Sequence, residues 1–183
     1  GRESEKLLSM LYPERQEKTV RDMYAEALLL QANTGARLAA GAWLAENDAM
    51  FETARRKAEK AIEFLERFAS ASDLGAAYRV RGAVELCQKK YQEAEGFFKL
   101  ALQKFEEARQ CGVHEKTEWH MWHAVSYWNM YVVKKETGNL QEAVAWLKQA
   151  ILLHGSIQGE DHPYTRQYRD CLVKLQQSIN PQN

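Results

Sequence analysis

The stretch Tyr91–Ala101, YQEAEGFFKLA, carries the spacing that decides the expected fold. It sets a large apolar residue at the start of a helix, an alanine one turn inside it, and a second alanine two turns further along the same stripe. The stretches Phe51–Ala61 and Leu140–Ala150 have the same spacing. Small residues at these positions let a neighbouring helix approach closely. The repetition therefore predicts stacked helical hairpins, an architecture typical of recognition surfaces.

Apolar stripes at helical spacing, broken by glycine and proline, divide the chain into about seven or eight expected helices. The expected segments are an N-terminal helix over about 14–33, hairpin repeats over about 36–70, 74–111 and 117–155, and a capping helix over about 163–178. Gly138 and Pro163 supply the later breaks. These segments predict one all-α domain over 1–183.

The two faces of the expected helices differ in composition. The alanines predicted to be buried at hairpin interfaces are Ala54, Ala94, Ala101, Ala143 and Ala150. The opposite face of the helix expected over 48–70 carries the charge run Arg55, Arg56, Lys57, Glu59 and Lys60. This run is predicted to be a solvated face.

Two short motifs resemble known repeat families. Gly82 paired with Ala94, and the turn Glu136–Ala143, resemble the tetratricopeptide repeat, in which a small residue of helix A faces an alanine of helix B. The stretch Gly159-Glu160-Asp161-His162-Pro163 is similar to the inter-repeat loop of kinesin-light-chain-type repeats. The resemblance covers about residues 36–178, and it departs from the family at Tyr131, where a small residue is usual.

This resemblance implies a right-handed superhelix of antiparallel hairpins with a concave face lined by the first helix of each repeat. By that register the face would bind a protein or peptide through Arg79, Trp128, Asn129, Lys135 and Lys174. In that hypothesis Trp128 is an apolar anchor, Asn129 holds the peptide main chain, and the cations make charge contacts. The function we expect is that of a scaffold or adaptor, with no catalytic residue and no cofactor.

Charge and hydropathy exclude several other classes of function. The chain has 25 basic and 25 acidic residues and a formal net charge of zero, whereas a general nucleic-acid binder carries a clear basic excess. No apolar run reaches the length of about 20 residues that a membrane-spanning helix needs. Cys87, Cys111 and Cys171 are odd in number and far apart, which favours free thiols and a cytoplasmic or nuclear location. The absent initiator methionine suggests a processed or excised chain.

The segment 109–123 is the alternative centre of chemistry. Cys111 and His114, followed by His120 and His123, offer ligand types that zinc accepts, although packing or a ligand contact is the favoured interpretation. Arg109 and His114 have the arginine-x4-histidine spacing that resembles all-helical endoribonucleases of the HEPN superfamily. A helical hydrolase and a ligand-sensing module of a larger protein therefore stay open as alternatives. We expect neither stoichiometric zinc nor nuclease activity.

Overall fold

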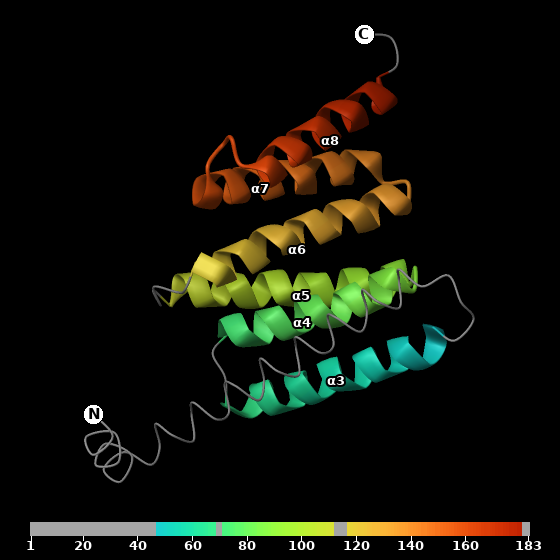
Figure 1. Ribbon diagram of the computed structural model, residues 1–183, viewed down its shortest axis with the longest axis vertical. Coiled ribbons are helices and arrows are strands. Elements are labelled where there is room, and N and C mark those ends of the chain that lie inside the picture. Colours follow the sequence, from blue (N-terminus) through green and yellow to red (C-terminus); the bar gives the residue numbers. More distant parts are fainter. Residues whose placement is uncertain (1–46, 69–70, 112–116, 181–183) are drawn as a thin grey trace.

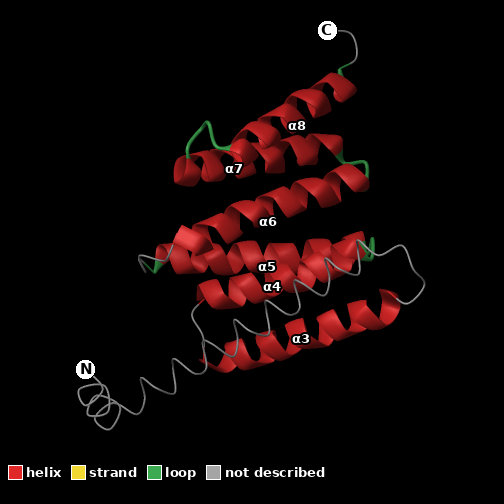
Figure 2. Cartoon of the chain, viewed as in Figure 1, coloured by secondary structure: helices red, strands yellow, loops and turns green. Residues whose placement is uncertain are grey.

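The computed structural model describes residues 47–68, 71–111 and 117–180. The helix expected over 14–33 and the first helix of the repeat 36–70 lie outside these residues. Over the described ranges the chain forms six helices and no strand, which confirms the all-α class (Figure 2). The helices are α3 (Asn47–Phe68), α4 (Ala71–Cys87), α5 (Tyr91–Gln110), α6 (Thr117–Glu136), α7 (Leu140–Gln158) and α8 (Pro163–Ile179).

The helices lie in chain order along the long axis of the molecule, and each runs antiparallel to the one before it (Figure 1). Each helix packs against its neighbours in the sequence, most extensively in the hairpins α4/α5 and α6/α7. Among the described helices that are not consecutive, only α4 and α6 bring their backbones close together, and α6 also reaches α8 through a side-chain contact, that of Trp128 with Tyr168. Helices α3, α5 and α7 are therefore separated from one another by the helices between them.

Alanine forms the closest interfaces of this stack. Ala54 is 1% exposed, and Ala94, Ala101, Ala143 and Ala150 are fully buried, which confirms the expected register. Because a methyl side chain keeps the helix axes close, the larger residues beside these alanines pack across the interface without gaps. One example is Phe98, which is fully buried in a cluster with Ala94.

The turns inside the two complete hairpins are built alike. A residue with positive φ stands two positions after the end of each of the helices α4 and α6, Lys89 at 59° and Gly138 at 79°. The following backbone N–H donates to a carbonyl of the helix, from Lys90 to Glu85 at 3.0 Å and from Asn139 to Lys134 at 2.8 Å. This is the Schellman arrangement, which satisfies carbonyls that the end of a helix leaves free. The hairpins α4/α5 and α6/α7 therefore have the same turn geometry.

Tyr131 stands where the tetratricopeptide resemblance leads us to expect a small residue, and its own hairpin compensates for part of the difference. In the first hairpin a Cβ on Gly82 would lie 2.7 Å from the ring of Phe98, so the glycine makes room for that ring. At the matching places of the second hairpin stand Tyr131 and Leu147, which share one buried cluster. The larger residue on α6 is thus accompanied by a residue on α7 that is smaller than phenylalanine, which offsets part of the added side-chain volume.

The connection from α7 to α8 differs from the expectation that the helix would end near residue 155. Helix α7 continues to Gln158, and Gly159, with φ of 93°, follows it. Gly155 lies inside the helix, and the Glu160 carboxylate approaches it so closely that a Cβ there would be 2.8 Å from an oxygen. His162 then caps α8 by accepting the Tyr164 N–H, and Pro163 begins the helix as predicted.

Candidate binding face

The five predicted binding residues lie on three helices. Arg79 is on α4; Trp128, Asn129 and Lys135 are on α6; Lys174 is on α8. Arg79, Trp128 and Asn129 are half-buried, whereas Lys135 and Lys174 are exposed. No ion pair, hydrogen bond or ring contact joins any two of them. The structure therefore distributes these side chains along the stack without bringing them into one cluster.

Arg79 contacts α6 through Trp122, a residue that the sequence analysis did not select. The guanidinium carbon of Arg79 lies 6.0 Å from the centroid of the Trp122 ring. The Arg79 Nε atom is buried and has no hydrogen-bond partner. Trp122 also packs against the core cluster formed by α3, α4 and α5. Since Trp122 lies seven residues before Asn129, helical spacing could have identified it as part of the same face.

Asn129 lies on that face of α6, two turns beyond Trp122. It is half-buried, and its side chain makes no hydrogen bond to another residue that the structure describes. Val125, between the two, is also only partly covered. Trp122, Val125 and Asn129, together with Arg79 of α4, are called the α4/α6 face below. It offers an apolar surface with an amide and a guanidinium.

Trp128 has a packing role that the sequence analysis did not assign. Its ring stacks on Tyr168 of α8 with centroids 4.4 Å apart and lies 4.8 Å from the ring of Tyr131. These contacts place it against the core cluster that joins α6, α7 and α8. Trp128 thus connects α8 to the rest of the stack, and a role as a binding anchor remains a prediction.

The histidine-rich segment separates into buried and exposed positions. His123 is 8% exposed and lies between the rings of Phe105 and Tyr127, at 5.4 and 4.9 Å. Burial lowers its pKa to about 4, and its Nε2 atom has no hydrogen-bond partner. His120 and Cys111 are exposed, and His114 lies outside the described residues. Within the described ranges no three metal-ligating side chains come together.

Arg109 is engaged with its own helix. Its guanidinium donates to Glu106 at 2.6 and 2.8 Å, one turn earlier on α5. Because His114 lies outside the described residues, the arrangement of the arginine-x4-histidine pair is not part of the structure. The one member that is placed has its charge paired and its side chain at the surface.

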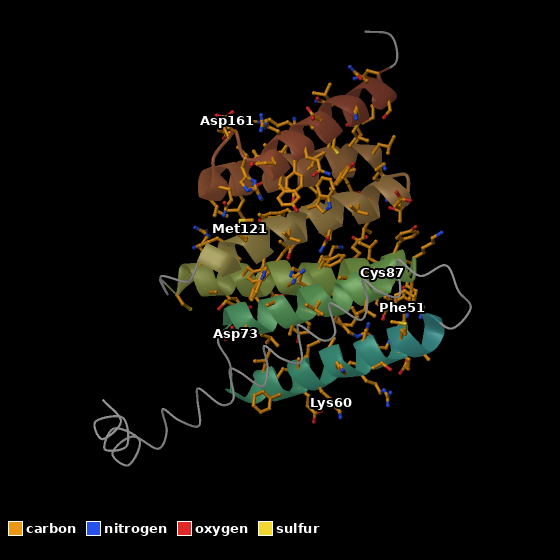
Figure 3. All side chains as sticks on the ribbon, viewed as in Figure 1. Phe51, Lys60, Asp73, Cys87, Met121 and Asp161 are labelled. Atoms are coloured by element: carbon orange, nitrogen blue, oxygen red, sulfur yellow. The ribbon has the colours of Figure 1, made fainter. Side chains whose placement is uncertain are left out.

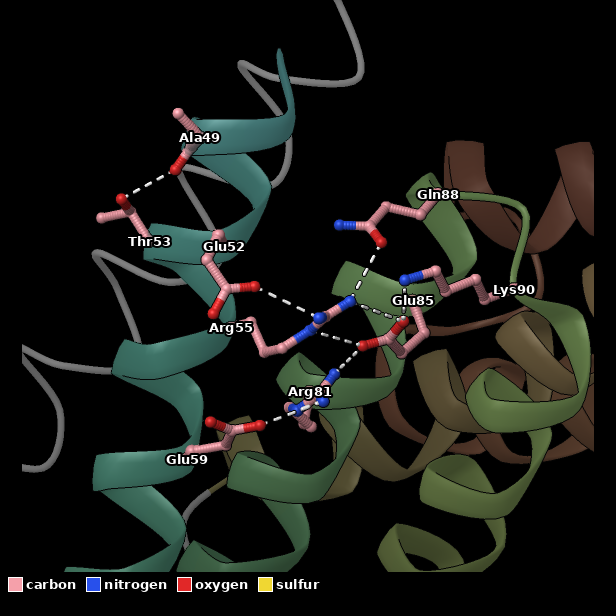
Figure 4. A network of polar contacts seen from close by, with 9 residues as sticks. All are labelled: Ala49, Glu52, Thr53, Arg55, Glu59, Arg81, Glu85, Gln88 and Lys90. Carbon is pink, nitrogen blue, oxygen red and sulfur yellow. Dashed lines mark hydrogen bonds and ion pairs between the residues drawn. The ribbon is translucent and has the colours of Figure 1, made fainter. Parts of the chain in front are cut away.

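The prediction that Arg55 lies on a solvated face of α3 is wrong, because Arg55 belongs to a network of polar contacts around the buried Glu85 (Figure 4). Its Nε donates to Glu85 at 3.1 Å, and Arg81 and Lys90 also pair with this carboxylate. Glu85 is 2% exposed. Burial raises its pKa, but hydrogen bonds and charges from Arg81 and Arg55 outweigh burial and leave the pKa below 4.5. Lys57 is likewise half-buried, whereas Lys60 lies on the side of α3 turned away from α4 (Figure 3).

A shallow hollow of about 410 Å³ opens beside this network, lined by Phe51, Glu52, Arg55, Gln88 and Lys90. Glu52, Glu85 and Gln88 already accept hydrogen bonds from Arg55. The polar groups of the hollow therefore satisfy one another. We interpret the network as a junction that joins α3 to the α4/α5 hairpin.

The next hairpin has a matching junction with the charges exchanged. Lys134 stands where Glu85 stands in the first hairpin, and its side chain is 9% exposed. Its Nζ lies 2.9 Å from Glu95 of α5 and 2.9 Å from Glu142 of α7. A buried charge on the first helix thus pairs with the preceding second helix in both hairpins, which fixes the order of the stack.

Comparison with known proteins adds no further assignment. No model of a known protein family matches the sequence, and no curated protein matches it either. Among the helices that the structure describes, none combines the length and the apolar character needed to cross a membrane.

Proposed function

We propose that the chain is a protein- or peptide-binding scaffold and that α4, α6 and α8 form its binding side. The observation that carries the proposal is the direct packing of α4 against α6, which no two of α3, α5 and α7 share in the described chain. Consecutive hairpins are therefore closer on the side of their first helices. A stack with this asymmetry curves toward that side and presents a preformed concave surface, which binds with little ordering cost.

The composition of the two sides supports the same assignment. Helices α3, α5 and α7 expose charged residues such as Lys60, Lys99 and Lys148, and Leu100 and Leu152 are exposed on them as well. On the α4/α6 face the side chains are half-buried, and neither Arg79 nor Asn129 makes a hydrogen bond or ion pair with a residue that the structure describes, although Arg79 lies over the Trp122 ring. Unsatisfied donors beside an aromatic ring are typical of surfaces that recognise another molecule.

We also propose that the hairpins are tetratricopeptide-like repeats. The repeated Schellman turn, the buried alanines and the exchanged charges at Glu85 and Lys134 support a repeating unit. After α7, a loop that begins at Gly159 leads to Pro163 and the final helix α8. This order is the one expected of a loop followed by a capping helix.

The test is selection of peptides from a random display library on the purified chain, followed by calorimetric titration. Asn129→Arg places a long side chain on the α4/α6 face, and Gln149→Arg makes the same change at an exposed position of α7. We expect selected peptides to bind Asn129→Arg about tenfold more weakly, because the added side chain obstructs the face. Binding to Gln149→Arg is expected to be unchanged.

Circular dichroism of both variants controls for folding. Failure to select any peptide, or equal weakening by the two variants, would contradict the proposed function.

A further inference from the structure

Arg79 is a half-buried cation without a counterion. The side chain makes no ion pair with any residue that the structure describes, and its buried Nε atom has no acceptor. Other cations with limited exposure are paired: Arg55 and Arg81 with Glu85, and Lys134 with Glu95 and Glu142. Arg79 is therefore an exception in a chain that otherwise matches its buried charges.

The missing acceptor has an energetic cost. Burial lowers the pKa of Arg79 to about 10, so the guanidinium is still charged at neutral pH. A charged group that leaves water without a hydrogen-bonded partner loses solvation, which neighbouring dipoles replace only in part. The Trp122 ring at 6.0 Å contributes a cation–π contact, but it supplies no acceptor for Nε–H. An anion from outside the described chain would complete the site.

The surroundings favour a carboxylate over a phosphate. One guanidinium carries a single positive charge, which one carboxylate neutralises through paired hydrogen bonds, whereas a phosphate group carries a charge of about −1.5 to −2 at pH 7 and calls for further cations. The other cations of the predicted binding set, Lys135 on α6 and Lys174 on α8, have no charge or ring interaction in common with Arg79, so one guanidinium supplies the positive charge on α4. Asn129, on the same face, offers an amide that suits the main chain of a peptide.

We propose that Arg79 receives a carboxylate of the bound peptide, with Trp122 holding the guanidinium in place. The inference rests on the proposed function, because it takes a peptide on the α4/α6 face as given. The chemistry is that of an acidic peptide, whose carboxylate comes either from an Asp or Glu side chain or from the C-terminus.

Three sets of short peptides test this with the intact chain. The first carries a fixed central Glu and has both termini blocked, the second has Gln at that position, and the third has the central Gln and a free C-terminal carboxylate. We expect the native chain to bind the Glu set, the free-carboxylate set, or both, at least about tenfold more tightly than the blocked Gln set. The set that binds more tightly identifies the source of the carboxylate.

The variant Arg79→Gln is expected to bind all three sets equally, whereas Arg56→Gln, at an exposed position of α3, is expected to keep the preference. Native binding without any preference would overturn the inference and leave the proposed function standing. If folded Arg79→Gln still prefers peptides with a carboxylate, the inference is likewise overturned and the proposed function stands. If no set binds the native chain, the proposed function and the inference both fall. The native comparison needs no variant, so a folding defect in Arg79→Gln would not protect the inference.

Discussion

At the scale of single residues, two glycines of this chain have opposite roles. Gly82 lies in the interior of α4 against the ring of Phe98, so its missing side chain is part of the packing. Gly96 lies at an exposed position of α5, where an added Cβ would meet no atom within 4 Å. The same substitution at the two positions separates the packing effect from the helix propensity of alanine.

Gly82→Ala is expected to destabilise the fold by about 1–2 kcal/mol, because the 2.7 Å approach to Phe98 forces the ring or the helix to move. Gly96→Ala is expected to stabilise it by about 0.5–1 kcal/mol, since alanine has less freedom to lose on folding. Urea denaturation of both variants measures the two effects. A Gly82→Ala protein as stable as Gly96→Ala would show that the close approach is not a constraint.

His123 makes the stability of the molecule depend on pH. Its folded pKa of about 4 lies below the ordinary value of 6.5, so the folded state resists protonation. This contribution is complete above pH 6.5 and is lost as the pH falls toward 4, because the unfolded chain takes up the proton first. At 1.36 kcal/mol for each pH unit, the loss amounts to roughly 3 kcal/mol.

Replacing His123 by Gln is expected to flatten the fall in stability over this range, whereas His120→Gln, at an exposed position of the same helix, should leave it as in the native chain. Unfolding free energies measured at several pH values provide the comparison. Parallel curves for the native and His123→Gln proteins would rule out His123 as the source.

At the scale of the elements, α8 is held by a polar anchor as well as by Trp128. The Thr165 hydroxyl donates to the Gly159 carbonyl at 3.0 Å, and the fully covered ring of His154 approaches the same hydroxyl oxygen with Nδ1 at 2.7 Å. Because the hydroxyl proton points to Gly159, the proton between the other two atoms belongs to His154 Nδ1. One threonine thus joins the end of α7, the connecting loop and the start of α8.

Thr165→Val keeps the shape of the side chain and removes this anchor. We expect a loss of about 1–3 kcal/mol in unfolding free energy, because His154 Nδ1 loses its partner and the Gly159 carbonyl keeps only the His162 N–H, at 3.3 Å. Faster amide exchange in α8 is expected to accompany it. Thr165→Ser, which keeps the hydroxyl, is the matched control, and equal stability of the Val and Ser variants would refute the anchor.

Helix starts were predictable where local chemistry determines them. Tyr91, Leu140 and Pro163 begin helices as expected, because a positive-φ turn or a proline precedes or opens each one. The end of α7 was predicted near Gly155 and lies at Gln158. The sequence does not show whether this glycine ends the helix or, as the structure has it, lies inside the helix against the Glu160 carboxylate.

The candidate site was predictable only in part. The register implied by the tetratricopeptide resemblance selected Arg79 and Asn129, but such a register does not reveal which aromatic ring another helix covers. Trp128 was therefore proposed as an anchor although Tyr168 stacks on it. The network around Glu85 was missed for the same reason, since Arg55 reaches it from 30 residues away.

At the scale of the whole molecule, the helices form two kinds of surface. Helices α3, α5 and α7 expose charged residues, and α4 and α6 bring their backbones together across the two described hairpins. We propose that a partner binds on the side of α4, α6 and α8.

Hydrogen exchange measured by mass spectrometry is the most direct test of this binding side, because protection by a bound peptide locates the contact without any substitution. A selected peptide is expected to slow amide exchange in α4 and α6 and to leave amide exchange in α3, α5 and α7 unchanged. Protection confined to α3, α5 or α7 would contradict it.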